Sequence, residues 1–331
     1  MKKTLFALAL ISSIQGISQD GLTYQVPPKE IMELVDVERT PYPIFNKDRS
    51  IMVTLQRDAF KSIEEMSRTE IRIGGLRIDP VTNIGSRTNY YNKLQVKDMG
   101  RTDNPLRKVT GIPKNAKLAN IVWSPDENYV AMTNTTKTGV ELWILDIKTV
   151  ELKKISKLTL NANTGNVINW AKDSKSMLVK TLPNDRKPLI DTKTAVPIGP
   201  TISTSDGKKA QNRTYQDLLK NKDDEHNFEQ LTLCEIHEVE INGTSKLWLE
   251  DDMYRSVSFS PDGEYVMITK IEKPFSYLVP YYRFPSRTTI YDKTAKSIQE
   301  VSVVPLIEDL PKGFMAVRTG PRNLQWRSDA A

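Results

Sequence analysis

"WSPDENYVAM", residues 123–132, sets an aromatic residue three places before an aspartate and follows the aspartate with an apolar run. The same order of residue types recurs along the chain, and this repetition decides the fold. Five copies start at an aromatic residue, the last of them short: "FNKDRSIMVTL" at Phe45, "WSPDENYVAM" at Trp123, "WAKDSKSMLV" at Trp170, "FSPDGEYVMI" at Phe259 and "WRSDAA" at Trp326.

Each copy predicts a tight corner between two β-strands. The aromatic residue ends one strand and packs inward, while Pro125 or Pro261 fixes the backbone at a turn position. Asp126 or Asp262 can accept hydrogen bonds from backbone amides of its own turn before the next strand begins. The phrase therefore encodes one hairpin each time it occurs.

The spacing of the copies is typical of a β-propeller. A second pattern, in residues 140–156 and 287–302, predicts another hairpin around an Asp-x-Lys-Thr or Asp-Lys-Thr turn, so that one repeat holds four strands. Successive copies are 78, 47, 89 and 67 residues apart, and a four-stranded blade takes about 40 to 50 residues. We therefore expect an all-β fold, a partial β-propeller of four-stranded blades with short helical insertions in the longer intervals.

Two segments outside the blades have helical character. Residues 183–230 contain a Pro-rich stretch and then a polar segment. Apolar residues recur in that polar segment at helical spacing: Tyr215, Leu218 and Leu219, then Phe228 and Leu231. Near the start, Pro28 stands where a helix can begin, and Ile31, Leu34 and Val35 form one apolar face.

The composition is that of a globular protein, with no sign of nucleic-acid binding. Of 331 residues, 38% are hydrophobic and 27% charged, and the mean hydropathy of -0.45 fits a chain without a spanning helix. The net charge is +6, and the basic residues are spread out rather than gathered in a stripe. The single cysteine, Cys234, excludes a disulfide within the chain and is predicted to be a core residue of a strand in residues 230–241.

The first twenty residues have the layout of a secretion signal. Lys2 and Lys3 precede an apolar run over residues 5–14, which is shorter than the ~20 residues that a bilayer crossing needs. We predict a signal peptide over residues 1–18, export to the periplasm or the medium, and no membrane attachment after cleavage. The alternative is an ordinary buried N-terminal helix.

Five further stretches carry a resemblance to a known family. They are "PPKEIMELVDV" (27–37), "GGLRIDPVTN" (74–83), "GKKAQNRTYQDLLKN" (207–221), "KPFSYLVPYYRFPSR" (273–287) and "TGPRNLQWRSD" (319–329). Over about residues 24–329 the chain resembles the N-terminal propeller of prolyl oligopeptidase family serine peptidases, in their glutamyl endopeptidase-like branch. The resemblance implies a propeller that sits over an α/β-hydrolase domain bearing Ser, Asp and His. It also implies that the propeller admits only peptides or flexible segments and that the enzyme cuts after Glu.

The chain lacks the sequence motif of such a hydrolase. No Gly-x-Ser-x-Gly pentapeptide occurs, and Ser86 and Ser205 have glycine on one side only. His226 and His237 are the only histidines, and neither follows a nucleophile in the hydrolase order, so both are predicted to be structural. We expect no catalytic residue here, an inactive chain when alone, and an incomplete propeller over residues 19–331 whose hydrolase domain is absent.

Neither a metal nor a cofactor is expected. Cys234 and His237 are three residues apart but lack a second pair of ligands nearby. The acidic residues 223–225 lack the loop spacing of a calcium site and are predicted to be a solvated face. Gly74 and Gly75 lack the spacing of a phosphate-binding loop.

The best candidate for substrate binding is an aromatic and arginine-rich loop. Tyr281 and Tyr282 stand beside Arg283 and Arg287, a composition typical of peptide-binding surfaces. Either arginine can pair with an acidic side chain of a substrate through two parallel hydrogen bonds. The alternative is a loop at a blade edge whose aromatic rings pack on the next blade and whose arginines pair with neighbours.

Two functions fit these observations. The first is the propeller portion of an exported, glutamyl-specific serine endopeptidase, which binds and gates peptide substrates together with a hydrolase domain. The second is a stand-alone, non-enzymatic propeller that binds a protein partner, as TolB-like domains do. A hydrolase-coding stretch after Ala331 favours the first function, and a natural terminus favours the second.

Overall fold

The computed structural model of the chain describes most of the sequence. The described residues are 25–100, 103–191, 194, 199, 215–308 and 320–328. The predicted signal peptide and Ser205 lie outside them. The chain divides into two compact units, Met1–Glu38 and Arg39–Ala331.

The described part of the first unit contains one helix, α2 (Lys29–Val35). It begins directly after Pro28, as the sequence predicts, because the fixed φ of proline suits the first turn of a helix. The apolar residues Ile31, Leu34 and Val35 are at least 50% exposed. The apolar face that they form is therefore open to solvent.

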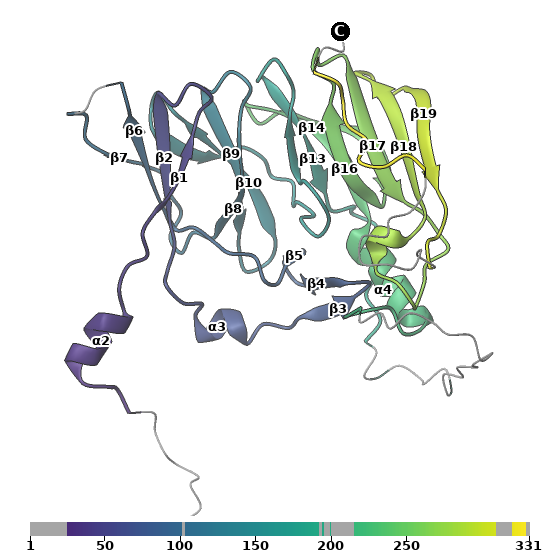
Figure 1. Cartoon of the computed structure of the whole chain (residues 1–331), viewed down its shortest axis with the longest axis horizontal. Helices are drawn as coiled ribbons and strands as arrows, with labels where there is room; N and C mark the ends of the chain where they lie inside the picture. Colours follow the sequence, from purple (N-terminus) through teal and green to yellow (C-terminus); the bar gives the residue numbers. More distant parts are fainter. Residues whose placement is uncertain are drawn as a thin grey trace, which may run out of the picture. The chain divides into compact units, whose positions relative to one another are not determined.

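Four antiparallel four-stranded sheets make up most of what is described of the second unit (Figure 1). The first sheet contains β1 (Tyr42–Phe45), β2 (Ile51–Gln56), β6 (Lys93–Asp98) and β7 (Arg107–Lys108). The second contains β8 (Leu118–Trp123), β9 (Tyr129–Thr135), β10 (Val140–Asp146) and β11 (Glu151–Lys154). The third contains β12 (Ile168–Trp170), β13 (Ser176–Thr181), β14 (Cys234–Glu240) and β15 (Ser245–Asp252). The fourth contains β16 (Tyr254–Phe259), β17 (Tyr265–Ile271), β18 (Ser286–Asp292) and β19 (Ser297–Val304).

The remaining elements of this unit are short. A three-stranded sheet contains β3 (Ile71–Ile73), β4 (Leu76–Asp79) and β5 (Ile84–Gly85). The helices are α3 (Ile63–Met66), α4 (Lys222–Thr232) and the 3-10 helix η1 (Tyr281–Arg283). Across the described residues, none of the helices combines the length and the apolar character that a membrane crossing needs.

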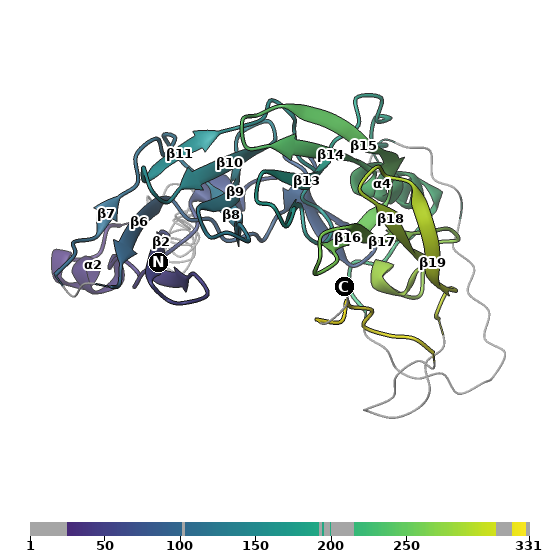
Figure 2. The ribbon, with the colours of Figure 1, turned by 90° about the horizontal axis from the view of Figure 1, so that it is seen from above.

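The four-stranded sheets follow one another in chain order and stand side by side (Figures 1 and 2). In each sheet every strand pairs with the next one of that sheet along the chain, and the first strand is an edge. This confirms the predicted all-β fold, a partial propeller of four-stranded blades. Among the described residues the blades do not close into a ring through strand pairing.

The four complete corner phrases form the predicted corners, but the Phe45 side chain is 41% exposed rather than packed inward. The aromatic residue is the last residue of its strand in every case: Phe45, Trp123, Trp170 and Phe259. Each aspartate accepts a hydrogen bond from the backbone N–H two residues later, at 2.9–3.2 Å: Asp48, Asp126, Asp173 and Asp262. The residue after the aspartate has a positive φ of 60–79°: Arg49, Glu127, Ser174 and Gly263. Only the last corner supplies the glycine that this conformation favours.

Trp326, the aromatic residue of the short fifth phrase, contacts the fourth sheet as Trp170 contacts the second. The indole Nε1 of Trp170 donates to the backbone oxygen of Val122 at 3.2 Å. The indole Nε1 of Trp326 donates to the backbone oxygen of Ser258, also at 3.2 Å. Each acceptor is the residue before a corner aromatic. In these two copies the tryptophan therefore also contacts a preceding blade, whereas the indole Nε1 of Trp123 is buried without a hydrogen-bond partner among the described residues.

Three insertions form one further hydrophobic core. They follow β2, β13 and β17 and carry the β3–β5 sheet, α4 and η1. Their core includes Ile73 and Ile78 from the first insertion and Phe228 from α4. The Phe228 ring is fully buried and meets Phe275 and Phe284 edge-on, with ring centroids 5.1 and 5.4 Å apart. These insertions account for the longer intervals between the corner phrases.

Two predicted boundaries are wrong. Tyr215 and Leu219 pack into the insertion core from an irregular segment rather than a helix. The strand expected from residue 230 begins at Cys234, because residues 230–232 form the last turn of α4. Leu231 therefore shares a helix face with Phe228, whereas Cys234 is a buried strand residue as predicted.

Candidate functional site

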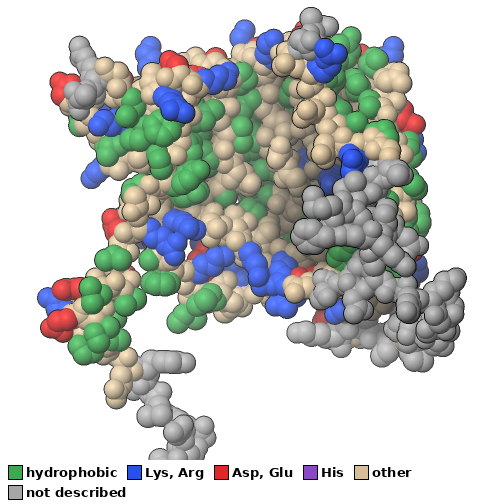
Figure 3. Space-filling model, in the orientation of Figure 1, with side chains coloured by type: hydrophobic (Ala, Val, Ile, Leu, Met, Phe, Trp, Pro, Cys, Tyr) green, Lys and Arg blue, Asp and Glu red, His purple; other side chains and the backbone are tan. Residues whose placement is uncertain are grey.

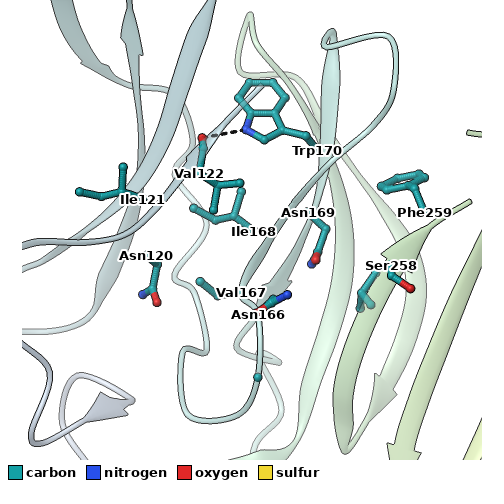
Figure 4. Close-up of a pocket in the computed structure, with 12 residues that line it drawn as sticks. Asn120, Ile121, Val122, Asn166, Val167, Ile168, Asn169, Trp170, Ser258 and Phe259 are labelled. Carbon is teal, nitrogen blue, oxygen red and sulfur yellow. Dashed lines mark hydrogen bonds between the residues drawn. The ribbon is translucent and has the colours of Figure 1, made fainter. Parts of the chain in front are cut away.

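A cavity of about 580 Å³ opens between the first strands of three successive blades (Figure 4). Strand β8 contributes residues 120–122, β12 and its preceding loop contribute 165–170, and β16 contributes 257–259. All three strands are edges of their sheets. The backbone N–H and C=O groups on one side of each strand therefore form no hydrogen bonds within their own sheet.

The polar lining of this cavity is neutral. Asn120, Asn166, Asn169 and Ser258 supply amide and hydroxyl groups, and none of the described residues that line the cavity is charged. Figure 4 shows these four side chains around the same opening. The Nδ2 atom of Asn169 is buried and has no hydrogen-bond partner among the described residues. Amide side chains both donate and accept hydrogen bonds, which matches the groups of a peptide backbone.

The predicted binding residues Tyr281, Tyr282 and Arg283 form the short helix η1. The Tyr281 ring lies 6.5 Å from Phe228 and is thus attached to the insertion core. Tyr282 is 47% exposed and meets Tyr281 edge-on at 5.9 Å. The guanidinium of Arg283 lies 5.8 Å from the centroid of Tyr282 and 5.6 Å from that of Tyr215. The structure therefore brings three of the four predicted residues together.

The glycine pair of the sequence positions η1. Gly74 and Gly75 form the turn between β3 and β4, with φ of +57° and +83°. The backbone oxygen of Gly74 accepts a hydrogen bond from the Tyr281 N–H at 2.8 Å. A Cβ atom at Gly75 would lie 2.6 Å from Cβ of Pro280. The glycines thus allow a close approach of two insertions.

The fourth predicted residue, Arg287, is neutralised by carboxylates. It lies on β18, with its Nε 2.6 Å from Oε1 of Glu272, and its guanidinium also contacts Glu300. Its pKa is raised, chiefly by the hydrogen bond with Glu272 and then by that with Glu300. This is the pairing expected if the arginine has a structural role. Arg283, in contrast, has no ion pair with a described carboxylate, and its Nε is buried without a hydrogen-bond partner.

A second arginine, which the sequence did not single out, lies on the same aromatic residues. The guanidinium of Arg255 is 5.9 Å from the ring centroid of Tyr281. Arg255 lies on β16 at an irregularity in the pairing with β17, between Tyr254 and Ser256. No motif surrounds it, so only the folded structure reveals its position.

A cavity of about 450 Å³ beside the three-stranded sheet is charged, and most of its charged side chains form ion pairs. Lys and Arg side chains gather over α3 and this sheet in Figure 3. The Glu70 carboxylate accepts a hydrogen bond from Ser86 at 2.5 Å and lies 2.8 Å from Arg72. The hydrogen bond from Ser86 lowers the pKa of Glu70 most, and Arg72 lowers it further. Asp79 pairs with Arg68 at 3.1 Å. We interpret this cavity as a structural network of ion pairs.

The histidines form no pair with a serine among the described residues. The Nε2 of His226 lies 3.0 Å from the backbone oxygen of Pro188. The Nδ1 of His237 lies 2.8 Å from Oγ1 of Thr181, and burial lowers the pKa of His237. Ser86 donates instead to a glutamate. Both histidines thus have structural partners.

The acidic residues 223–225 begin a helix. They occupy the first turn of α4, where negative charge is favourable. Asn221 caps this helix by accepting a hydrogen bond from the Asp224 N–H at 2.8 Å. Within the described residues, no group of three His, Cys, Asp or Glu side chains is arranged to hold a metal ion.

Curated relatives of the chain have a common name. A scan against models of protein families gives no match. A protein of Oryza sativa subsp. japonica named probable glutamyl endopeptidase, chloroplastic, is 30% identical over 325 residues, which cover 95% of this chain and 34% of the rice protein. The chain is similar to one third of a protein of this name. The protein of the same name from Arabidopsis thaliana is also 30% identical, covering 93% of this chain and 33% of its own length.

These relatives confirm the glutamyl endopeptidase-like resemblance of the sequence. The chain spans about a third of their length. Among solved structures, an acylaminoacyl peptidase in complex with Z-Gly-Gly-Phe-chloromethyl ketone matches with a TM-score of 0.41 and 12% identity, over 82% of this chain and 33% of the peptidase. A putative TolB from Agrobacterium tumefaciens matches with a TM-score of 0.33 and 9% identity, over 81% of this chain and 83% of that protein.

Proposed function

We propose that the chain is the propeller portion of an exported serine endopeptidase that cuts after glutamate, and that it binds and gates peptide substrates. In this proposal a hydrolase domain outside these residues supplies the serine, aspartate and histidine. The observation that carries the proposal is the 30% identity, over 95% of the chain, to a third of a protein named probable glutamyl endopeptidase. Export is proposed from the layout of residues 1–18 alone.

The neutral cavity between β8, β12 and β16 supports a role in admitting peptides. Its volume of about 580 Å³ lies in the range of sites that enclose small ligands. An extended segment of a few residues fits such a space, whereas a folded domain does not. Asparagine side chains and strand edges bind backbone groups, which every peptide has, and so require no particular sequence.

Peptide binding and cleavage by the purified chain test this function. We expect a short unstructured peptide to raise the fluorescence anisotropy of an attached dye on binding, and a folded protein with the same sequence in a rigid loop not to bind. Trp170 lines the cavity, so binding should also change tryptophan fluorescence. In the matched control, Trp170→Phe should remove most of that fluorescence change while the peptide still binds.

Neither peptide nor folded protein should be cleaved by this chain. Cleavage of a glutamate-containing peptide would contradict the assignment of catalysis to another domain. Equal binding of the folded protein would contradict gating and would favour a stand-alone propeller that binds a protein partner. Binding of neither would overturn the proposed role in substrate binding.

A further inference from the structure

Arg255 and Arg283 lie on one group of aromatic rings, and the backbone of Arg255 packs on Gly165 at the wall of the cavity. We propose that these two arginines bind the carboxylate of an acidic side chain in the peptide, and so contribute the preference for glutamate. This inference rests on the proposed function and deepens it. The rings are those of Tyr215, Tyr281 and Tyr282, which together with the two arginines we call the arginine–tyrosine cluster.

The cluster is continuous from one arginine to the other. The guanidinium of Arg255 lies 5.9 Å from the Tyr281 centroid. Tyr281 meets Tyr282 edge-on at 5.9 Å, and the guanidinium of Arg283 lies 5.8 Å from the Tyr282 centroid. Tyr215 lies 5.6 Å from the same guanidinium. A guanidinium that lies over a ring can still direct N–H groups away from that ring, where they can bind a carboxylate.

The positive charge of the cluster is available to a ligand. Neither Arg255 nor Arg283 forms an ion pair with a carboxylate of the described residues, whereas Arg287 contacts both Glu272 and Glu300. The Nε of Arg283 is buried and has no acceptor among the described residues. A buried N–H without an acceptor is costly, and a carboxylate can satisfy it only if the side chains around Arg283 move aside on binding.

The cluster adjoins the cavity through the backbone of β16. Arg255 lies at a pairing irregularity of this strand, and such irregularities redirect side chains. Gly165, which lines the cavity, packs directly on the backbone of Arg255. A Cβ atom at Gly165 would lie only 1.9 Å from the Arg255 backbone oxygen. A peptide in the cavity is therefore close to the strand that carries Arg255.

The Tyr281 ring, which lies between the two arginines, is held in place before any ligand arrives. The Tyr281 N–H donates to the backbone oxygen of Gly74 at 2.8 Å, and the Tyr281 ring lies against Phe228. Phe228 is fully buried in the insertion core. An arginine that lies over a ring held in this way loses little freedom when it binds, which increases affinity.

Three peptides that differ only at one residue and at the C-terminus test whether the cluster binds a side-chain carboxylate or a terminal one. The first has a central Glu and an amidated C-terminus, the second has Gln in its place, and the third has Gln and a free C-terminal carboxylate. We expect the purified chain to bind the Glu peptide about tenfold more tightly than the amidated Gln peptide, as charged hydrogen bonds allow. If the third peptide binds as tightly as the first, the cluster binds a C-terminal carboxylate and our assignment to a side-chain carboxylate is wrong.

Substitutions of the arginines test which side chains cause the preference for Glu over Gln. Arg255→Met and Arg283→Met keep the apolar stem on the ring, and each should reduce the Glu-to-Gln affinity ratio to about one. Arg287→Met is the matched control and should leave the ratio unchanged. Lysine at either position keeps the charge without the planar fork and should preserve part of the ratio, which tests the cluster even if a methionine variant folds poorly.

The outcomes distinguish this inference from the proposed function. Equal binding of Glu and Gln peptides by the unaltered chain would overturn the inference and leave peptide binding in place. Loss of the Glu-to-Gln affinity ratio in Arg287→Met alone would also overturn the inference. If no peptide binds, both fail.

Discussion

Replacement of Lys180 by methionine should stabilise the protein at neutral pH. Lys180 lies in β13 and is 1% exposed. Its ammonium group contacts the backbone oxygen and the hydroxyl of Thr164, and no described carboxylate forms an ion pair with it. Burial lowers the pKa of Lys180 from 10.5 to about 8. Methionine has a similar length and carries no charge.

The size of the effect follows from that pKa. The difference between 10.5 in the unfolded chain and about 8 in the fold corresponds to about 3 kcal/mol against the charged form. At pH 7 the amine is charged in both states, so the folded protein carries the full penalty. The variant also loses the hydrogen bonds to Thr164, which lowers its free energy of unfolding by about 1 kcal/mol. The free energy of unfolding of Lys180→Met should therefore exceed that of the wild type by about 2 kcal/mol.

The pH dependence gives a second, independent test. Because the folded-state pKa is the lower one, the unfolded chain binds more protons between about pH 8 and pH 10.5. The wild type therefore gains stability from this group as the pH rises through that window. From pH 7 to pH 9 the penalty falls by about 1 kcal/mol, and the advantage of Lys180→Met should shrink by the same amount.

Urea unfolding at pH 7, 8 and 9, followed by tryptophan fluorescence, measures both effects. The exposed Lys148→Met is the matched control and should change the free energy of unfolding by less than about 0.5 kcal/mol at every pH. A Lys180→Met protein that is less stable than the wild type at pH 7, with a difference that does not vary with pH, would refute the reasoning.

Three further predictions concern the core, the blade contact and the corners. Phe228→Ala should lower the free energy of unfolding by about 3–5 kcal/mol in urea, because the ring fills the insertion core; a loss below about 1 kcal/mol would contradict a shared core. Trp326→Phe should cost about 1 kcal/mol in the same assay, since it removes the N–H that binds Ser258; no change would mean that the bond does not stabilise the fold. The hydrogen bond from Ser260 lowers the pKa of Asp262, so this carboxylate stabilises the fold above its unfolded pKa and loses that effect as the pH falls through its folded pKa. Asp262→Ala should accordingly lower the melting temperature at pH 7 and not at acid pH, and an equal loss at both would argue against this role.

The blades could be predicted because their signals are local. An aromatic residue three places before an aspartate forms one turn, and the hydrogen bond from the aspartate to the amide two residues later lies within that turn. The positive φ that follows each aspartate was not predictable from Arg49, Glu127 or Ser174, because these residue types do not favour it. The boundary between α4 and β14 was also missed, since apolar residues of both lie in one continuous run.

The candidate site was predictable only where its residues are neighbours in the chain. Arg283 stands beside two tyrosines in the sequence, and their grouping survived folding. Arg255 comes from another strand, and only tertiary structure places it on the same rings. The pairing of Arg287 with Glu272 and Glu300 depends on partners in other segments. The cavity itself exists only because three edge strands from different blades meet.

The shared core of the three insertions limits how such a propeller can change. Residues from three different blades, such as Ile78, Phe228 and Phe284, fill one apolar volume. Deleting any one insertion would expose the apolar surface of the other two. During evolution, and in any engineered chimera, these segments should therefore be gained, lost or transplanted as a set.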